Sequence, residues 1–396
     1  MISLDEAREY VLSLVEPLPA AAVPLAEARG LVLADAVIAS EAVPPFANTA
    51  MDGFAVRAAD TGRRASLRIV GTLAAGATFD GEVQPGEAVR IMTGAPMPDG
   101  ADAVVMVELC TVEGDNVTVA EAVPVGNHVR PAGDDMAPGD EVLTAGTVLS
   151  PGALGVLATL GISEPFVILR PRVGVMSTGD ELVDGPSPLQ PGQIRDSNRR
   201  TILALVEESG FSGVDLGLVR DDEDAIAAAL ELAAAGCDAV LTTGGVSMGD
   251  FDFVKVVLDR IGDMRWMQVA IKPAKPLAAG RLRTTPIIGL PGNPVSSMIS
   301  FELFARPALR KMAGHADLDR RRVRAVVEGG LRRKEDGKIH FARVSMSQRD
   351  DLTFVARSAG GQGSHHTAAM AHADGLAILP DGDGIADGDT VEVIVL

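Results

Sequence analysis

The sequence predicts a multidomain α/β plus β protein, in which a central α/β domain with a mostly parallel sheet is flanked by β-rich domains. Three observations predict this fold class. From about residue 170, short apolar runs alternate with segments of helical periodicity, as in parallel strands joined by crossover helices. Residues 31–140 hold many glycines, prolines and short β-branched runs, and short strands return after a basic segment at about residue 319.

Length and charge restrict the classes of protein to consider. A chain of 396 residues is too long for one core, and roughly two to four units are expected. The composition, 47% apolar and 22% charged, is that of a soluble globular protein. Asp and Glu outnumber Lys and Arg 54 to 35, and this net charge of −19 argues against nucleic acid as a partner. Any phosphate must therefore be bound locally.

The N-terminal segment predicts a helix, because Ser3 and Glu6 form a capping box and the early charges exclude a signal peptide. The uncharged run 142–163 is long enough to span a bilayer. Glycines and Pro151 interrupt it, so we expect a strand, a turn and a buried helix, and no membrane partner. Cys110 and Cys237 have no metal-binding or redox spacing, which predicts two buried thiols in a reducing compartment and a cytoplasmic protein.

The elements of the central domain follow a regular order. Its strands are the apolar parts of "RVGVMSTGDEL", "GVDLGLVRDD", "CDAVLTTGG" and "TPIIGLPGNP". Helices follow over about 199–209, about 222–235, "FDFVKVVLDRIG" and "SSMISFELFARPALRKM". Ser197 is placed to cap the first of these helices. In the preceding β region the strand-like runs include "SLRIVGTL", "AVRIM", "ADAVVMVEL" and "NVTVAEAV".

Polar and glycine residues follow each predicted parallel strand, where ligands of open α/β sheets bind. They are Thr178, Gly179, Asp180 and Glu181 after the first strand, Asp221 and Asp222 after the second, 244–252 after the third and 291–297 after the fourth. Any one of these sets can be an ordinary loop or helix cap. Four sets at one sheet edge favour a binding site.

Two of these loops predict phosphate binding. Gly244, Gly245 and Ser247 of "GGVSMG" can turn backbone amides toward a phosphate, and "GLPGNPVS" repeats the arrangement with Pro291 and Pro294. The aspartates at 250 and 252 would repel an anion alone. Because Mg²⁺ prefers one or two carboxylates plus phosphate oxygens, the combination predicts metal and phosphate together.

A second anion feature is "AIKPAKPLAAG". Lysine is scarce, with six against 29 arginines, yet Lys272 and Lys275 lie three residues apart, each followed by a proline that excludes helix. A compact oxyanion is one candidate ligand, and two solvated surface lysines are the alternative. Three further segments, "PPFANTAMDGFAVRAAD", "RIMTGAPMPDGADAVV" and "VRPAGDDMAPGDEV", read on composition as turns between strands.

Taken together, these segments resemble the MoeA family of molybdopterin molybdenumtransferases, which includes the E domain of gephyrin-like proteins. The resemblance covers nearly the whole chain and also rests on "GQIRDSN", "IKPAKP", "GLPGNPVSSM" and the terminal "GGQGSH". It implies a central three-layer α/β domain that binds the pterin, and a homodimer whose active cleft is completed by the β domain of the partner subunit. The implied domains are 1–44 with 137–170 (an elongated linking and dimerisation domain), 45–136 (β-rich), 171–318 (α/β) and 319–396 (C-terminal β).

The resemblance also assigns residues. By motif, the functional carboxylates are Asp52, Asp135, Glu181, Asp221 and Asp252. Substrate binding falls to Thr93, Pro291 and Pro294, and to a molybdate and phosphate pocket of Lys272, Lys275, Ser296 or Ser297, Arg343 and Ser364. One departure is Gln268, which stands where many members have a lysine. Neither His365 nor His366 is expected to bind a metal.

The implied reaction converts adenylylated molybdopterin and molybdate to molybdenum cofactor and AMP. Mg²⁺ held by carboxylates among Glu181, Asp221 and Asp252 would bridge the phosphates, and the lysines would hold molybdate. Asp52 and Asp135 would position groups from across the dimer. A molybdopterin adenylyltransferase and downstream cofactor-transfer proteins are the expected partners. The alternatives are that the chain is itself an adenylyltransferase, or a non-catalytic pterin-binding scaffold.

Overall fold

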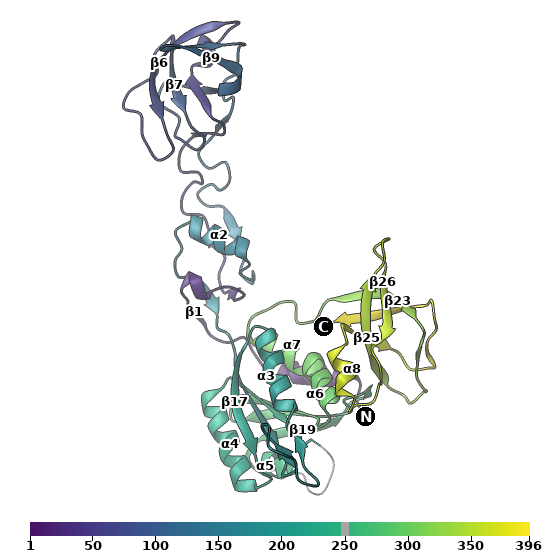
Figure 1. The fold of residues 1–396 in the computed structure, drawn as a ribbon. Helices are drawn as coiled ribbons and strands as arrows, with labels where there is room; N and C mark the ends of the chain where they lie inside the picture. The colour runs from purple at the N-terminus through teal and green to yellow at the C-terminus, as the bar shows by residue number, and fades with distance from the viewer. Residues whose placement is uncertain (247–252) are drawn as a thin grey trace. The chain divides into compact units, whose positions relative to one another are not determined.

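The computed structural model spans the chain and describes residues 1–246 and 253–396. The chain divides into two compact units, which we describe separately (Figure 1). The first unit contains Met1–Ala22, Gly30–Ala34 and Phe166–Leu396, and the second contains Val23–Arg29 and Asp35–Pro165.

The first unit is built around a six-stranded sheet of order β17-β14-β18-β22-β21-β19. The first four strands of this order pair in parallel, and β21 and β19 add an antiparallel edge. Their bounds are β14 Arg172–Thr178, β17 Ser212–Val219, β18 Ala239–Thr243, β19 Asp263–Gln268, β21 Pro276–Leu282 and β22 Thr285–Leu290. The predicted mostly parallel sheet is confirmed, and the antiparallel hairpin lies in the segment between the third and fourth predicted strands.

Helices cover both faces of this sheet, as the alternation of its buried side chains requires. Val175, Leu241 and Ile288 pack in one cluster with α1, α3 and α6, whereas Met176 and Val240 pack in another with α4 and α5. The helices are α1 Leu4–Ser13, α3 Asn198–Glu208, α4 Glu223–Gly236, α5 Phe253–Ile261, α6 Pro294–Ser300, the π-helix η4 Phe301–Ala305 and α7 Arg306–Met312. These three layers are the predicted architecture.

The predicted helix caps have different outcomes. Ser3 accepts a hydrogen bond from the Glu6 amide at 3.1 Å and caps α1 as expected. Ser197 is the residue before α3, but its side chain makes no capping bond, so that prediction is wrong. Its backbone already has helical angles, and Asp196 Oδ1 accepts the Arg199 amide at 3.2 Å in its place.

The C-terminal part of the first unit is a closed β-barrel with its own buried core. Its strands close a ring of order β25-β26-β23-β29-β27, because β27 pairs with β25 as well as with β29. They are β23 Arg322–Glu328, β25 Ile339–Gln348, β26 Phe354–Ser358, β27 Gly375–Leu379 and β29 Thr390–Val395. A short strand from the α/β part, β20 (Ile271–Lys272), pairs in parallel with β25.

Smaller elements complete this unit. β1, β13 and β2 form a three-stranded sheet, and β15–β16 and β24–β28 are two-stranded pairs. Their bounds, with the last helix, are β1 Ala20–Ala22, β2 Val32–Leu33, β13 Phe166–Ile168, β15 Leu182–Val183, β16 Ile194–Arg195, β24 Leu331–Arg332, β28 Gly384–Ile385 and α8 Thr367–Ala371.

The second unit is rich in β structure, as predicted. Its main sheet has the order β8-β5-β7-β6-β10-β9, and two pairs, β4–β11 and β3–β12, accompany it. The strands are β3 Val37–Ile38, β4 Asn48–Thr49, β5 Gly53–Val56, β6 Ala65–Leu73, β7 Glu87–Ile91, β8 Ala103–Met106, β9 Cys110–Glu113, β10 Asn116–Val119, β11 Val129–Arg130 and β12 Glu141–Leu143. The helices are η1 Leu25–Glu27, η2 Ala58–Asp60, η3 Val107–Leu109 and α2 Pro151–Thr159.

Two predictions about burial are corrected. The uncharged run does form a strand, a turn and a helix, but α2 is not a buried helix, since only Ala153 and Leu157 of its nine residues are buried. Within the described residues, no helix is both long and apolar enough to cross a membrane. Cys110 and Cys237 are free thiols that are half-buried, and burial raises the pKa of Cys110 to about 11.

Candidate functional site

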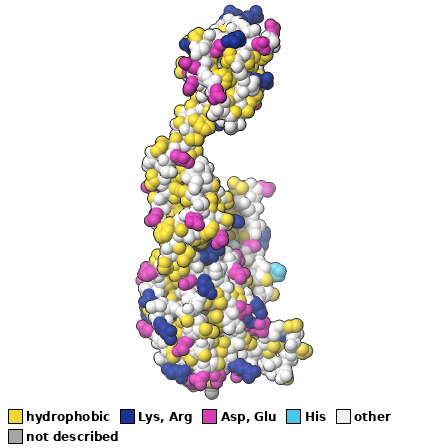
Figure 2. All heavy atoms as spheres, turned by 90° about the vertical axis from the view of Figure 1, so that its left-hand side faces the viewer, with side chains coloured by type: hydrophobic (Ala, Val, Ile, Leu, Met, Phe, Trp, Pro, Cys, Tyr) yellow, Lys and Arg dark blue, Asp and Glu magenta, His cyan; other side chains and the backbone are white. Residues whose placement is uncertain are grey.

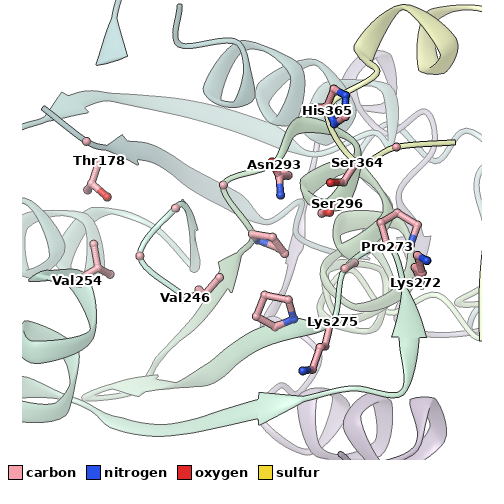
Figure 3. A pocket seen from close by; sticks show the side chains of 18 of the residues that line it. Thr178, Val246, Val254, Lys272, Pro273, Lys275, Asn293, Ser296, Ser364 and His365 are labelled. Atoms are coloured by element: carbon pink, nitrogen blue, oxygen red, sulfur yellow. The ribbon is translucent and has the colours of Figure 1, made fainter. Parts of the chain in front are cut away.

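A cavity of about 980 Å³ opens in the first unit at the carboxyl ends of β14, β18 and β22 (Figure 3). Parallel strands end at the same edge of a sheet, so the loops that follow them meet there. Of the residues predicted from sequence, the cavity is lined by Glu181, Asp221, Gly244, Gly245, Lys272, Lys275, Pro291, Ser296 and Ser364. Ser247 and Asp252 lie outside the described residues.

Carboxylates occupy the end of the cavity near β14 and β17. Asp221 and Asp180 each donate a backbone amide to the other's carboxylate, both at 3.3 Å, and Glu181 lies beside them. Burial, with the neighbouring charges of Asp180 and Glu181, raises the pKa of Asp221. This is the electrostatic setting that a cation relieves, and carboxylate oxygens are the ligands that Mg²⁺ prefers. The described residues hold no group of three side chains arranged as a complete metal site.

Backbone geometry makes room for Glu181. Gly179 has a φ of +144°, and a Cβ atom at this position would lie 2.6 Å from Oε2 of Glu181. A side chain there would therefore push the carboxylate from its place. The glycine that precedes the predicted carboxylate is thus part of how the chain positions it.

The glycine loop after β18 has fewer free backbone amides for a phosphate than its sequence suggests. Gly244 and Gly245 have φ values of +88° and +71°, and both line the cavity. The Gly244 amide, however, donates to the Leu290 carbonyl at 3.1 Å. The prediction that this amide faces a phosphate is therefore corrected, because it is used to join the ends of β18 and β22.

The loop after β22 forms the third side of the cavity. Pro291, Gly292 and Asn293 line it, and Pro294 starts α6. Of the two serines given as alternatives, Ser296 lines the cavity, whereas Ser297 is buried and is not a lining residue. Neighbouring segments hold this loop: Asn198 Nδ2 donates to Gly292 O at 2.7 Å, and the Val295 amide donates to Ser364 O at 3.2 Å.

Cations gather at the opposite end. Figure 3 shows Lys272 at the end of β20, with Pro273 and Lys275 on the segment that leads to β21. Ser296 and Ser364 lie close by, and Thr178 lies on the other side. Among the polar lining residues, the sequence reasoning missed Lys338 and Gln362, and it gave His365, which also lines the cavity, no binding role. The scarcity of lysine was a signal for Lys338, whereas its place at the cavity depends on how the barrel pairs with the α/β part.

Arg343 supports the cavity wall from behind. It lies on β25, is fully buried, and donates to the carbonyls of Gly361 at 2.6 Å and Gly363 at 3.2 Å. Its Nε and Nη1 atoms have no partner among the described residues, and burial lowers its pKa. Arg343 is not among the lining residues, so it holds the loop that carries Ser364. Gln268, the departure from the family pattern, ends β19 and also lies outside the lining.

The remaining predicted residues belong to the second unit. Asp52 Oδ1 accepts the Thr93 amide at 2.7 Å and the Thr93 hydroxyl at 2.6 Å. These two bonds, with the charge of Arg90, lower the pKa of Asp52. The two predicted residues thus form one exposed pair. Asp135 is exposed as well. Its backbone amide donates to the Val43 carbonyl at 2.9 Å.

Family models match three consecutive parts of the chain. They are described as "MoeA N-terminal region (domain I and II)" for residues 2–161, "Probable molybdopterin binding domain" for 174–311, and "MoeA C-terminal region (domain IV)" for 329–396. The second match contains the loops that line most of the cavity.

Full-length relatives give the same result. A molybdopterin molybdenumtransferase of Haemophilus influenzae is 37% identical over 396 residues, covering 99% of this chain and 98% of the relative. Molybdopterin molybdenumtransferase 2 of Mycobacterium tuberculosis is 38% identical over 404 residues, covering 99% and 97%. The crystal structure of a molybdopterin biosynthesis moeA protein from Pyrococcus horikoshii OT3 matches with a TM-score of 0.83 at 29% identity, covering all of both chains.

Proposed function

Because the chain belongs to the MoeA family of molybdopterin molybdenumtransferases, we propose that it inserts molybdenum from molybdate into adenylylated molybdopterin and releases AMP. One observation carries the proposal: a single cavity of about 980 Å³ has carboxylates at one end and lysines at the other. That volume is at the upper end of small-molecule sites, which suits a pterin joined to a nucleotide.

The acidic end supports a Mg²⁺ requirement. Glu181 and Asp221 would hold the ion, and Asp252 is a third candidate outside the described residues. When bound, Mg²⁺ supplies charge neutralisation at the phosphates whose anhydride bond breaks. Among the residues present, the donor set fits the ion, because Glu181 and Asp221 bring carboxylate oxygens, the ligands that Mg²⁺ prefers, to the cavity lining.

The basic end supports molybdate binding. Lys272 and Lys275 carry three donors each on flexible stems and can enclose a tetrahedral dianion, and the hydroxyls of Ser296 and Ser364 add neutral donors beside them. The buried Arg343 guanidinium would fix the loop of Ser364 and add positive potential from behind. The chain would thus hold molybdate and the phosphates in the same cavity. Loss of AMP and insertion of the metal would then use one bound orientation of the substrates, which lowers the barrier.

The quaternary arrangement is also a proposal. The chain would act as a cytoplasmic homodimer, in which the exposed pair of Asp52 and Thr93, with Asp135, faces the cavity of the partner subunit. An adenylyltransferase would supply the substrate and cofactor-transfer proteins would accept the product. The net charge of −19 supports small molecules over nucleic acid, and acidic and basic side chains are interspersed on the face shown in Figure 2.

The test incubates the protein with adenylylated molybdopterin, Mg²⁺ and molybdate while AMP and molybdenum cofactor are measured. We expect both products to form together and to require molybdate. ATP consumption without molybdate would favour an adenylyltransferase, and binding without AMP release would favour a scaffold. AMP release at the wild-type rate by both Asp52→Ala and Asp221→Ala would contradict the site.

A further inference from the structure

A third lysine reaches the cavity from a different part of the fold. Lys338 precedes β25 of the C-terminal barrel, yet it lines the same cavity as Lys272 and Lys275. The parallel pairing of β20 with β25 brings it there, since the register sets Ile271 opposite Ile339 and Lys272 opposite His340. The α/β part and the barrel therefore each contribute cations to one wall.

One carboxylate holds these cations together. Asp336 lies 3.1 Å from Lys338 Nζ, 4.0 Å from Lys272 Nζ, 2.9 Å from an Arg333 nitrogen and 3.0 Å from His340 Nε2. Its side chain is 26% exposed, and the hydrogen bonds and charges of Lys338 and His340 lower its pKa to about 2. Burial lowers the pKa of His340, so this ring is a neutral donor near pH 7. Asp336 stays ionised, accepts a hydrogen bond from the Lys338 amine, and lies within ion-pair distance of the Lys272 amine.

Buried groups fix the position of Asp336 in turn. The Arg333 side chain is only 1% exposed and donates to the carbonyls of Lys338, Leu379 and Pro380 at 2.7 to 3.2 Å. Asp381 pairs with Arg333 and accepts the amides of Asp336 at 3.1 Å and Gly337 at 3.0 Å. The segment that carries Lys338 is thus held by both backbone and side-chain bonds.

The charges of this wall do not balance. Arg333, Lys272 and Lys338 carry three positive charges against the two negative charges of Asp336 and Asp381, and Lys275 adds another positive charge on the same wall. In a chain of net charge −19, a local cationic surplus at a cavity indicates an anionic ligand. Lys338, with its side chain 20% exposed, is placed to contact it.

We propose that Lys338 binds a tetrahedral oxyanion of the substrate in this cavity, and that Asp336 is the positioning residue that sets Lys338 and Lys272 for that contact. The inference rests on the proposed function and deepens it, because it adds a residue of the barrel to the anion site. The oxyanion is either free molybdate or a phosphate of the adenylylated pterin, and both share the charge and shape that an ammonium group recognises.

The test measures anion binding apart from catalysis. Equilibrium dissociation constants for molybdate and, separately, for AMP are determined by calorimetry on the wild type, Lys338→Met and Lys338→Arg, with Lys334→Met as the control on an exposed lysine of the same segment. Methionine keeps the length of the side chain and removes its charge. Loss of one charge-assisted hydrogen bond weakens binding by roughly 10- to 100-fold, so we expect that loss for Lys338→Met, partial recovery with Lys338→Arg and no change with Lys334→Met.

The two ligands identify the oxyanion. Weaker molybdate binding alone assigns Lys338 to the metalate, and weaker AMP binding alone assigns it to the phosphate. Unchanged binding of both by Lys338→Met overturns the proposal, as does a wild type that binds neither. If Lys338→Met does not fold, as judged by its thermal unfolding, Lys338→Gln takes its place. If the wild type binds these anions but releases no AMP, the proposed function is wrong. The proposal that Lys338 binds an oxyanion would still hold.

Asp336→Asn tests the positioning role. We expect KM for the affected ligand to rise severalfold while kcat and the melting temperature stay near the wild-type values. A purely structural role would lower the melting temperature and kcat and leave KM unchanged, and that result overturns the assignment of Asp336.

Discussion

The two ends of the cavity are built in different ways. At the acidic end, Glu181 and Asp221 follow directly on neighbouring parallel strands, and backbone amides and a glycine position them. At the basic end, the amines of Lys272 and Lys338 come from different parts of the fold and share the side chain of Asp336. The sheet alone organises the acidic end, whereas the basic end depends on the docking of the barrel.

This difference has a functional consequence. The acidic end is crowded with like charges and has no balancing cation among the described residues, which is why we propose a metal ion there. The basic end has its carboxylate already in place and keeps a positive surplus. In the proposed function, a cation would therefore bind at the acidic end because it relieves repulsion, and an anion would bind at the basic end because its donors are already in place.

The largest expected effect is at the acidic end. Asp221→Asn removes a charge that would face Mg²⁺ and the phosphates, so we expect AMP release to fall by roughly 100- to 1,000-fold at saturating substrate. The measurement is a Mg²⁺ titration of AMP release. Asp224→Asn, on the exposed side of the first turn of α4, is the matched control and should stay near the wild-type rate. If Asp221→Asn lowers the rate of AMP release by less than about twofold, Asp221 is not part of the catalytic site.

At the basic end the effect should be smaller and confined to one substrate. Lys275→Met removes a donor of the proposed molybdate site, and we expect KM for molybdate to rise by roughly 10- to 100-fold. KM for the adenylylated pterin should change little. Steady-state rates with each substrate varied in turn distinguish the two, and equal increases in both constants would contradict separate sites for the two anions.

The contrast between the ends also explains what could be predicted from the sequence. The α/β order, the β-rich flanking regions and the strand-end carboxylates all follow from local patterns, because parallel strands place their ends together. Lys338 could not be placed, since its position depends on the β20–β25 register, in which Ile271 pairs with Ile339, 68 residues further along the chain. The assignment of Arg343 as a lining residue failed because motifs do not show which way a side chain points.

Local interactions also account for the smaller errors. Ser197 matches the composition of a helix cap, but Asp196 takes that role because it already pairs with the buried Arg199 at 2.9 Å. The Gly244 amide is used by a tertiary hydrogen bond to Leu290. The local sequence preference is reasonable in both cases. The buried Asp196–Arg199 pair overrides it in the first, and the Gly244–Leu290 hydrogen bond, between residues distant in sequence, overrides it in the second.

A glycine substitution tests whether the acidic end depends on backbone geometry. Gly179→Ala places a Cβ atom against the Glu181 carboxylate, and we expect apparent Mg²⁺ affinity to fall by about tenfold, as for loss of an outer-sphere support. Gly185→Ala is the matched control, because Gly185 also has a positive φ, +83°, but open space around it. Equal effects of the two variants would mean that backbone strain, and not contact with Glu181, is responsible.

The smallest effect separates stability from activity. Without Mg²⁺, the pKa of Asp221 is raised in the folded state, so folding binds a proton and the carboxylate destabilises the protein as pH rises through that pKa. Asp221→Asn should therefore raise the melting temperature at pH 7 by about 1 to 2 °C, and the gain should vanish at acidic pH, where wild-type Asp221 is protonated. Saturating Mg²⁺ should reverse the order by stabilising only the wild type. Thermal unfolding at two pH values with and without Mg²⁺ measures all of this, and a lower melting temperature for the Mg²⁺-free variant at pH 7 would show that Asp221 is a structural residue and the acidic end is not set for a cation.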